Sequence, residues 1–113
     1  MPRPRKVRRV CGLPQCKSFG PLDSASEEYI VLAIDEYETV RLIDLMGCSQ
    51  EECAAFMKVA RTTVQSIYDS ARRKIAQALV EGRVLRIGGG SYELCSEAGC
   101  CCGGCPVRKG CRR

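Results

Sequence analysis

The sequence predicts a mainly α-helical protein: a helix-turn-helix with a small β-hairpin as a wing, an extended basic N-terminal arm and a cysteine-rich tail. Three observations predict this fold class. Residues 61–81 carry apolar side chains at helical spacing, and a shorter capped helix is expected just before them. Aromatic residues make up only 5% of the 113 residues, and Trp is absent. The core must therefore be built from Leu, Ile, Val, Ala and Met, which suits small packed helices.

The first 29 residues predict an extended arm with little regular structure, because they contain four of the five prolines. Residues 1–20 also carry six Lys/Arg and no acidic residue, a composition that attracts polyanions such as nucleic acid. The Arg-Pro-Arg-Lys at 3–6 resembles arms that lie in the narrow minor groove of A·T-rich DNA. A solvated tail without a partner is the other interpretation. The candidate DNA-backbone contacts of the arm are Arg3, Arg5, Lys6, Arg8 and Arg9.

The domain that follows the arm, residues 30–94, opens with a short apolar run that fits either a strand or the approach to a helix. Asp35 followed by Glu38 resembles a capping box. A helix is therefore expected over 36–46, and Gly47 is suited to end it.

Two further helices are predicted after this one. Ser49 and Glu52 form a second capping box, and the short helix that they open is expected to end near Lys58. The third helix is expected over 61–81, since Gly82 is suited to end it. Its apolar stripe consists of Val64, Ile67, Tyr68, Ala71, Ile75, Ala78 and Leu79.

The wing is predicted from the residues after the third helix. Residues 83–87 and 91–94 are short stretches that flank the three glycines 88–90. A glycine turn between two such stretches is typical of a β-hairpin. Beside a DNA-reading helix, such a hairpin would add contacts to the DNA backbone or minor groove.

The helices on either side of residues 58–60 have the form of a helix-turn-helix, whose second helix enters the major groove of DNA. The face opposite the apolar stripe carries polar and basic side chains. Those near the start of the helix are of types that reach base edges, and those farther along suit phosphates. The predicted base readers are Arg61, Thr62, Gln65, Ser66 and Asp69, and the predicted backbone contacts are Arg72, Arg73 and Lys74. An ordinary solvated helix in a bundle is the alternative.

Several motifs of the chain occur in the same order in a known family. They are the opening MPRPRKVRRV, the element Phe19-Gly20-Pro21, and the helical stretch that begins with DEYE at Asp35. Over roughly residues 1–95 the chain resembles this family of small prokaryotic proteins that are predicted to bind DNA. The helix-turn-helix of the family is in turn similar to region four of sigma factors, which reads promoter DNA. The resemblance implies a sigma region four-like fold and a role in transcription.

Two positions depart from the family. Cys48 stands where the family usually has Leu, and a buried thiol can serve there as a small hydrophobe. Lys58 stands where Gly or Asn is common in the turn. We interpret Cys48 and Cys53 as packing residues rather than as metal ligands.

Ten cysteines and no histidine distinguish the composition. The charged N-terminus lacks the apolar stretch of a secretory signal, and no apolar run reaches the ~18 residues of a membrane span. A cytoplasmic location is therefore expected. In this reducing compartment, cysteines bind metal ions more readily than they form disulfides. Cys102 and Cys105 form a C-x-x-C, a spacing that lets two thiolates bind one ion. The candidate ligands are Cys95, Cys100, Cys101, Cys102, Cys105 and Cys111 in the tail 95–113, with Cys11 and Cys16 in the arm.

Zinc is the expected ion and an iron–sulfur cluster is the alternative, because thiolate ligands alone do not decide between them. A thiol-rich tail without metal is the third interpretation. The absence of His excludes His-based acid–base catalysis and catalytic triads that contain His. A thiol oxidoreductase that uses Cys102 and Cys105 is the enzyme alternative, but no thioredoxin-like βαβ pattern surrounds these residues. A non-enzymatic protein is therefore expected.

The sequence thus predicts a cytoplasmic, sequence-specific DNA-binding protein that regulates transcription. Its partner is double-stranded DNA rather than a membrane, and a homodimer is left open. The alternative function is a metal or iron–sulfur carrier, or a redox-sensing protein, that acts through protein partners. Salt-dependent binding of a DNA duplex by the metal-free protein would distinguish the two functions.

Overall fold

The structure, a computed structural model, describes residues 7–23 and 27–94 of the chain. It is an α/β fold of three α-helices and two small sheets, and about half of it is helical. The elements in chain order are β1 (Arg8–Val10), β2 (Ser18–Phe19), β3 (Tyr29–Leu32), α1 (Ile34–Val40), a π-helical turn (Arg41–Leu45), α2 (Gln50–Met57), α3 (Arg61–Glu81), β4 (Val84–Ile87) and β5 (Tyr92–Leu94). The expectation of a mainly α protein is corrected, because the predicted arm forms β1 and β2, which pair with β5 and β4 in two separate sheets.

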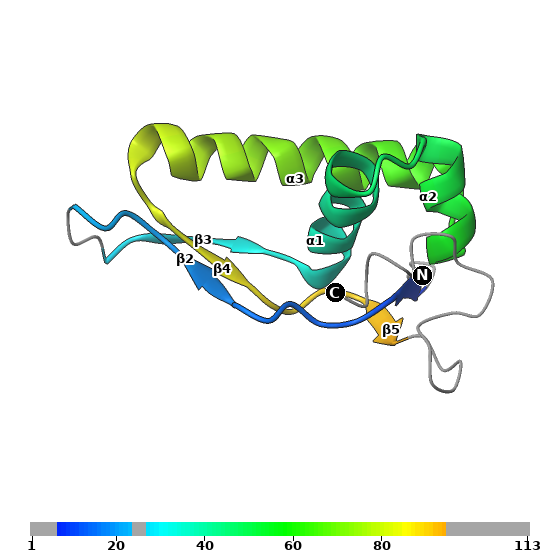
Figure 1. Cartoon of the computed structure of the whole chain (residues 1–113), viewed down its shortest axis with the longest axis horizontal. Helices are drawn as coiled ribbons and strands as arrows, with labels where there is room; N and C mark the ends of the chain where they lie inside the picture. Colours follow the sequence, from blue (N-terminus) through cyan, green and yellow to red (C-terminus); the bar gives the residue numbers. More distant parts are fainter. Residues whose placement is uncertain (1–6, 24–26, 95–113) are drawn as a thin grey trace, which may run out of the picture.

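The long helix α3 lies along one side of the molecule (Figure 1). Beneath its C-terminal half lies a sheet with the order β2-β4-β3, in which β3 runs parallel to β4 and β2 antiparallel. Leu32 of β3 lies opposite Ile87 of β4, and both are buried. Together with Leu85 they pack against Ala71 of α3. One core of the protein therefore lies between the sheet and α3.

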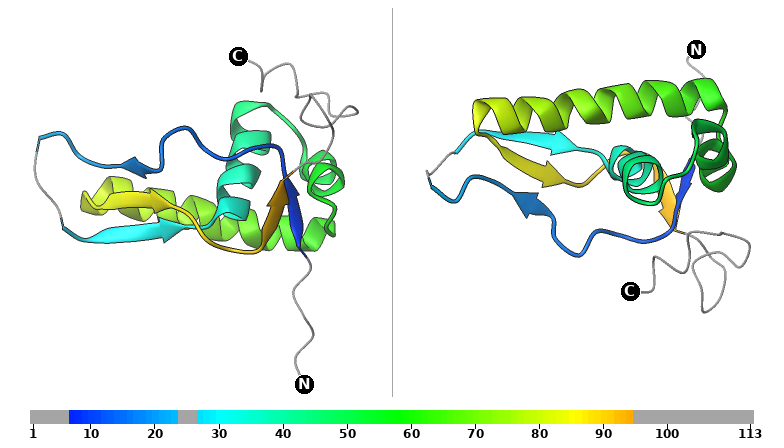
Figure 2. Two further views of the ribbon diagram at one scale, coloured as in Figure 1. Left: turned by 90° about the horizontal axis from the view of Figure 1, so that it is seen from below. Right: turned by 45° about the horizontal axis from the view of Figure 1, so that its top comes forward.

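The described part of the predicted arm, residues 7–23 and 27–29, carries regular structure. β1 pairs in parallel with β5, so that Arg8 lies opposite Tyr92 and Val10 opposite Leu94. Figure 2 shows these two strands side by side, apart from the three-stranded sheet. Val10 is 1% exposed and belongs to the core beneath α3. The strand partners are distant in sequence, so local composition did not reveal them.

β4 and β5 do not pair with each other, so the predicted hairpin wing is wrong. Each strand joins a different sheet, with partners from the N-terminal part of the chain. The carbonyl oxygen of Gly89 accepts a hydrogen bond from the amide of Ile34 at 3.0 Å. Gly90 has a φ of 88°, and a Cβ there would lie 2.9 Å from the Cβ of Ala33. The glycines thus let the chain pass close to the start of α1 instead of making a tight turn.

α1 begins two residues before the predicted start. Its N-cap is Ala33, whose amide donates to Oε1 of Glu36 at 2.9 Å. Asp35 and Glu38, which were expected to form a capping pair, are instead 5% and 2% exposed. Asp35 forms an ion pair with Arg8, and Glu38 forms one with Arg41. These ion pairs hold both carboxylates inside the protein.

The predicted second and third helices are confirmed. Ser49 Oγ accepts from the amide of Glu52 at 3.0 Å, and Glu52 Oε1 accepts from the amide of Ser49 at 2.9 Å. Lys58 ends α2 in the left-handed conformation with a φ of 60°, and Gly82 ends α3 with a φ of 68°. The second core cluster consists of Leu42, Cys48, Cys53, Ala54, Met57 and Val64. The predicted packing role of the two cysteines is therefore confirmed.

Candidate nucleic-acid interface

The outer face of α3 is open to solvent. All five predicted base readers are exposed, and so are the first two predicted backbone contacts of this helix. These positions follow one another at steps of one and three residues, so they form a single stripe along the helix. We call this stripe the reading face; it consists of Arg61, Thr62, Gln65, Ser66, Asp69, Arg72 and Arg73.

The other side of α3 is held firmly by the rest of the protein. α2 ends just before the turn 58–60, and Val64 of α3 is 0% exposed in the core shared with α2. The hydroxyl of Tyr68 donates to Oδ1 of Asp44 at 2.6 Å, and this hydrogen bond raises the pKa of Tyr68. The guanidinium of Arg72 lies 5.3 Å from the centre of the Tyr68 ring. The reading face therefore stands on a helix whose position is fixed by packing and hydrogen bonds.

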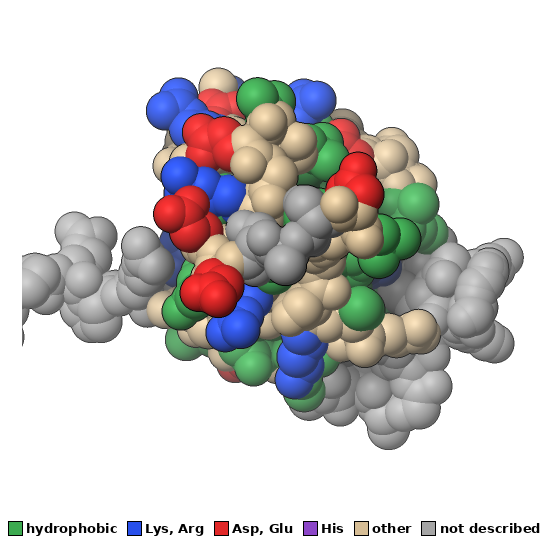
Figure 3. All heavy atoms as spheres, turned by 90° about the vertical axis from the view of Figure 1, so that its left-hand side faces the viewer, with side chains coloured by type: hydrophobic (Ala, Val, Ile, Leu, Met, Phe, Trp, Pro, Cys, Tyr) green, Lys and Arg blue, Asp and Glu red, His purple; other side chains and the backbone are tan. Residues whose placement is uncertain are grey.

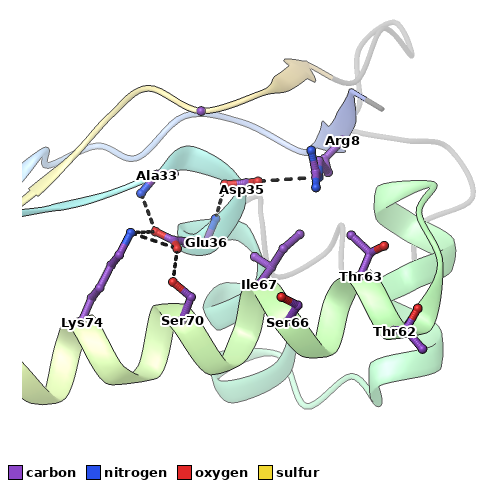
Figure 4. A pocket seen from close by; sticks show the side chains of 11 residues that line it. Arg8, Ala33, Asp35, Glu36, Thr62, Thr63, Ser66, Ile67, Ser70 and Lys74 are labelled. Atoms are coloured by element: carbon purple, nitrogen blue, oxygen red, sulfur yellow. Dashed lines mark hydrogen bonds and ion pairs between the residues drawn. The ribbon is translucent and has the colours of Figure 1, made fainter. Parts of the chain in front are cut away.

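Two predicted DNA-backbone residues lie in an internal charge network (Figure 4). Lys74 Nζ lies 2.8 and 3.0 Å from the carboxylate oxygens of Glu36, which also accepts from Ser70 Oγ at 2.6 Å. Arg8 is 8% exposed, and its Nε lies 3.7 Å from Oδ2 of Asp35. Both bases neutralise buried acids on α1, a role that the sequence did not predict.

The ionised state of Glu36 is favoured by its partners. Burial by itself would raise the pKa of this carboxyl group. Hydrogen bonds from Lys74, from Ser70 and from the amide of Ala33 outweigh burial, so the net effect is a lowered pKa. An ion pair therefore joins α1 to α3 at neutral pH.

The remaining basic residues of the predicted arm are placed differently. Arg9 Nε donates to the carbonyl oxygen of Phe56 at 2.9 Å, which ties β1 to α2. Arg3, Arg5 and Lys6 lie outside the described residues. Among the described basic candidates, Arg61, Arg72 and Arg73 on α3 are exposed.

A polar cleft of about 590 Å³ opens between α3 and the start of α1 (Figure 4). Its α3 wall carries the hydroxyls of Thr62, Thr63 and Ser66, and the opposite wall carries Arg8 and Asp35. Thr62 and Ser66 thus border both the cleft and the reading face. The cleft can accept polar groups, because hydroxyls dominate one wall and a charged pair the other.

Sequence reasoning missed Asp35, Glu36 and Ser70 as parts of this site. The available signal was a group of acids at the start of a helix, which was interpreted only as capping. The spacing from Ser70 to Lys74 places both on one side of α3, since four residues make about one helical turn. Only the packing of α1 against α3 brings that side to Glu36.

The described cysteines are divided between the core and the surface. Cys11 is half-buried beside the second core cluster, whereas Cys16 is exposed, with its Sγ 3.5 Å from the carbonyl oxygen of Ser18. Burial, followed by the charge of Glu38, raises the pKa of Cys53 to about 12, so this thiol stays protonated at neutral pH. The predicted tail ligands lie outside the described residues: Cys95, Cys100, Cys101, Cys102, Cys105 and Cys111.

Within residues 7–23 and 27–94, no three His, Cys, Asp or Glu side chains are grouped so as to hold a metal ion. In the same part of the chain, none of the helices combines the length and the apolar character that a membrane span requires. The candidate site that the described residues do form is the reading face with the adjoining cleft.

Comparisons with known proteins agree on one family. The family model described as "Protein of unknown function DUF134" matches residues 1–95. A UPF0251 protein of Desulfitobacterium hafniense (strain DSM 10664 / DCB-2) is 58% identical over 112 residues, covering 96% of this chain and 90% of the relative. A UPF0251 protein of Caldicellulosiruptor saccharolyticus is 52% identical over 92 residues, covering 81% and 66%. No solved structure matches the chain.

Proposed function

The chain belongs to the prokaryotic DUF134 family, and from this premise we propose that it binds double-stranded DNA through the reading face of α3. One observation carries the proposal. The polar and basic residues at the start of α3 are all exposed on one stripe, while the opposite side of the helix is buried. A helix presented in this way after a short helix and a three-residue turn fits the major groove, in the manner of a sigma region four-like helix-turn-helix.

Each residue type on the reading face has a chemical partner on a base pair. Arg61 can donate two hydrogen bonds to guanine. The side-chain amide of Gln65 can donate one hydrogen bond to adenine and accept another from it. Asp69 can accept from the amino group of cytosine. Arg72 and Arg73 lie farther along the helix, where phosphates border the groove. In this proposal the protein is a non-enzymatic regulator of transcription that works in the cytoplasm.

The proposal is tested by selecting a preferred duplex from a randomised pool and measuring its affinity by fluorescence anisotropy. Gln65→Ala is expected to lose about 1–3 kcal/mol on the selected duplex and much less on a random one. Gln77→Ala is the matched control, because it changes the same residue type on the same helix beyond the reading face. Equal losses on both duplexes would show that Gln65 does not read bases.

A second measurement uses the metal-free protein. A DNA-binding protein shows affinity that falls steeply with salt, because phosphate contacts release counterions. If the metal-free protein binds no duplex with salt-dependent affinity, the proposal of DNA binding is refuted. The alternative, a metal or iron–sulfur carrier that acts through protein partners, is then favoured.

A further inference from the structure

Arg72 is the arginine of the reading face that lies over an aromatic ring. Its guanidinium is 5.3 Å from the centre of the Tyr68 ring, about one helical turn earlier in α3. At this distance the face of the ring attracts the positive charge. Among the described residues, no ring contact or ion pair is found for Arg61 or Arg73, the other two arginines of this face. Of the three, Arg72 therefore has the side chain whose position is restricted in the free protein.

The Tyr68 ring is in turn held in place by another part of the chain. The residue is 9% exposed, and its hydroxyl donates to Oδ1 of Asp44 at 2.6 Å. Asp44 belongs to the π-helical turn that follows α1. This hydrogen bond raises the pKa of Tyr68, so the hydroxyl keeps its proton and goes on donating at neutral pH. The charge of Arg72 acts in the opposite sense on the same pKa, as expected for a cation close to the phenol.

The position of Arg72 along α3 favours a phosphate as its partner. The predicted base readers, from Arg61 to Asp69, span about 12 Å at ~1.5 Å per residue, and the major groove is about 12 Å wide. Arg72 lies roughly 4–5 Å farther along the helix axis, where the DNA backbone borders the groove. A guanidinium carries more N–H donors than one ring can occupy, and these donors match phosphate oxygens. A side chain that is already restricted also loses less conformational entropy when it binds.

We propose that Arg72 is the phosphate contact that anchors the reading face on DNA, a role that rests on the proposed function. In this arrangement Tyr68 and Asp44 are positioning residues, because they act on DNA only through the guanidinium of Arg72. Tyr68 supplies the ring on which the guanidinium lies, and Asp44 fixes the ring through the hydroxyl. The π-helical turn is thereby linked to DNA binding, although it lies outside the helix-turn-helix itself.

The first experiment measures the affinity of the full-length protein for the selected duplex and for a random duplex, by fluorescence anisotropy at several salt concentrations. Arg72→Ala is expected to weaken binding to both duplexes by about tenfold, because a charge-assisted hydrogen bond is lost. It should also flatten the log–log salt dependence by ~0.9, the value for one phosphate contact. Arg73→Ala is the matched control. It removes the same side chain from the next position, where no ring is found beneath it, and should cost less affinity.

The second experiment is a double-mutant cycle. Tyr68→Leu removes the ring and keeps an apolar side chain at this buried position, and it should weaken binding to both duplexes by about threefold. Combined with Arg72→Ala, it should have no further effect, because no guanidinium is left to position. A merely structural role of Tyr68 would instead weaken binding equally in both backgrounds. Tyr68→Phe keeps the ring and should bind more tightly than Tyr68→Leu.

Asp44→Ala gives a second cycle that leaves the core untouched, because Asp44 is exposed. Removing an acid favours DNA binding in any background. The loss of the hydrogen bond to Tyr68 opposes this gain only where Arg72 is present. The effect of Asp44→Ala on affinity should therefore be less favourable in the natural protein than in Arg72→Ala. This cycle keeps the proposal testable even if Tyr68→Leu does not fold.

A second arginine–tyrosine stack supplies the control for the ring. The guanidinium of Arg86 on β4 lies 4.3 Å from the centre of the Tyr29 ring on β3, in the sheet beneath the C-terminal half of α3 (Figure 1). At the end of the molecule where α3 ends, Lys/Arg side chains lie beside Asp/Glu side chains (Figure 3). Arg83 pairs there with Glu28 and Glu81, at 3.3 and 2.9 Å. Because acids balance the positive charge there, Tyr29→Leu should leave the affinity for both duplexes unchanged.

Circular dichroism checks that each variant is folded. The proposal is overturned if Arg72→Ala leaves the salt dependence unchanged, weakens binding to the selected duplex alone, or costs no more affinity than Arg73→Ala. It is also overturned if Tyr68→Leu or Asp44→Ala has the same effect with and without Arg72. In each of these cases, salt-dependent binding by the natural protein still supports the proposed function. A natural protein that binds no duplex refutes the proposed function and the role of Arg72 together.

Discussion

Replacing Lys58 by Gly should stabilise the protein. Lys58 ends α2 with a φ of 60° and a ψ of 46°, a left-handed conformation that costs a residue with a Cβ roughly 1–2 kcal/mol. Glycine avoids this cost but loses about 0.5–1 kcal/mol more conformational entropy on folding. Lys58 is exposed, and no side-chain hydrogen bond of it is found among the described residues. The expected net gain is therefore about 0.5–1 kcal/mol, which for a domain of this size raises Tm by a few degrees.

Urea unfolding and thermal unfolding, both followed by circular dichroism, measure this gain. Lys58→Ala is the control, because it removes the same charge from the end of α2 but keeps the Cβ and its strain. The control should be no more stable than the natural protein, since a cation near a helix C-terminus contributes a few tenths of a kcal/mol. If Gly and Ala have equal effects, or if Gly destabilises the protein, the backbone argument is refuted.

Two further predictions concern the charge network and the tail. Glu36→Gln should lower the free energy of unfolding at pH 7 by about 1–2 kcal/mol, because the ion pair with Lys74 is lost. The pKa of Glu36 is lowered from 4.5, so its contribution is present above that pH and lost as pH falls through the folded-state pKa. Urea unfolding from pH 7 down to pH 3 should show the gap between the two proteins closing, and a constant gap would contradict this assignment. Replacing Cys102 and Cys105 by Ser should remove bound zinc or iron from the purified protein, as measured by elemental analysis. Cys53→Ala is the control, which should keep the metal but lose stability, because it removes a buried side chain. Full metal content in the double variant would contradict the metal site in the tail.

The helices α2 and α3 could be predicted because their limits depend on neighbouring residues. The reciprocal hydrogen bonds of Ser49 and Glu52 form within one turn, and Gly82 adopts its left-handed conformation without help from distant parts of the chain. The buried side of α3 followed from helical spacing alone, and so did most of its exposed side. Leu79 was the exception: it is exposed although the neighbouring Ala78 is buried, because it lies about two helical turns after Arg72 and therefore on the same, solvent-facing side of α3.

The candidate site was predictable in part for the same reason. The exposed stripe from Arg61 to Arg73 is a property of one helix, so periodicity was enough to find it. Lys74 lies beside this stripe in the sequence, but it turns toward Glu36 of another helix. Which neighbour a side chain on the flank of a helix meets depends on packing, and the sequence of that helix does not contain this information.

By itself, the sequence determined the two later helices, the polar stripe of α3 and the role of Cys48 and Cys53 in the core. Only the tertiary structure decided that β1 pairs with β5, that β4 joins β2 and β3, and that Arg8 lies against Asp35. Helix hydrogen bonds and caps join residues at most a few positions apart, so local pattern is sufficient for them. Strand pairs and buried ion pairs join residues that are distant along the chain, and which of many chemically suitable partners meet is settled only when the whole core packs.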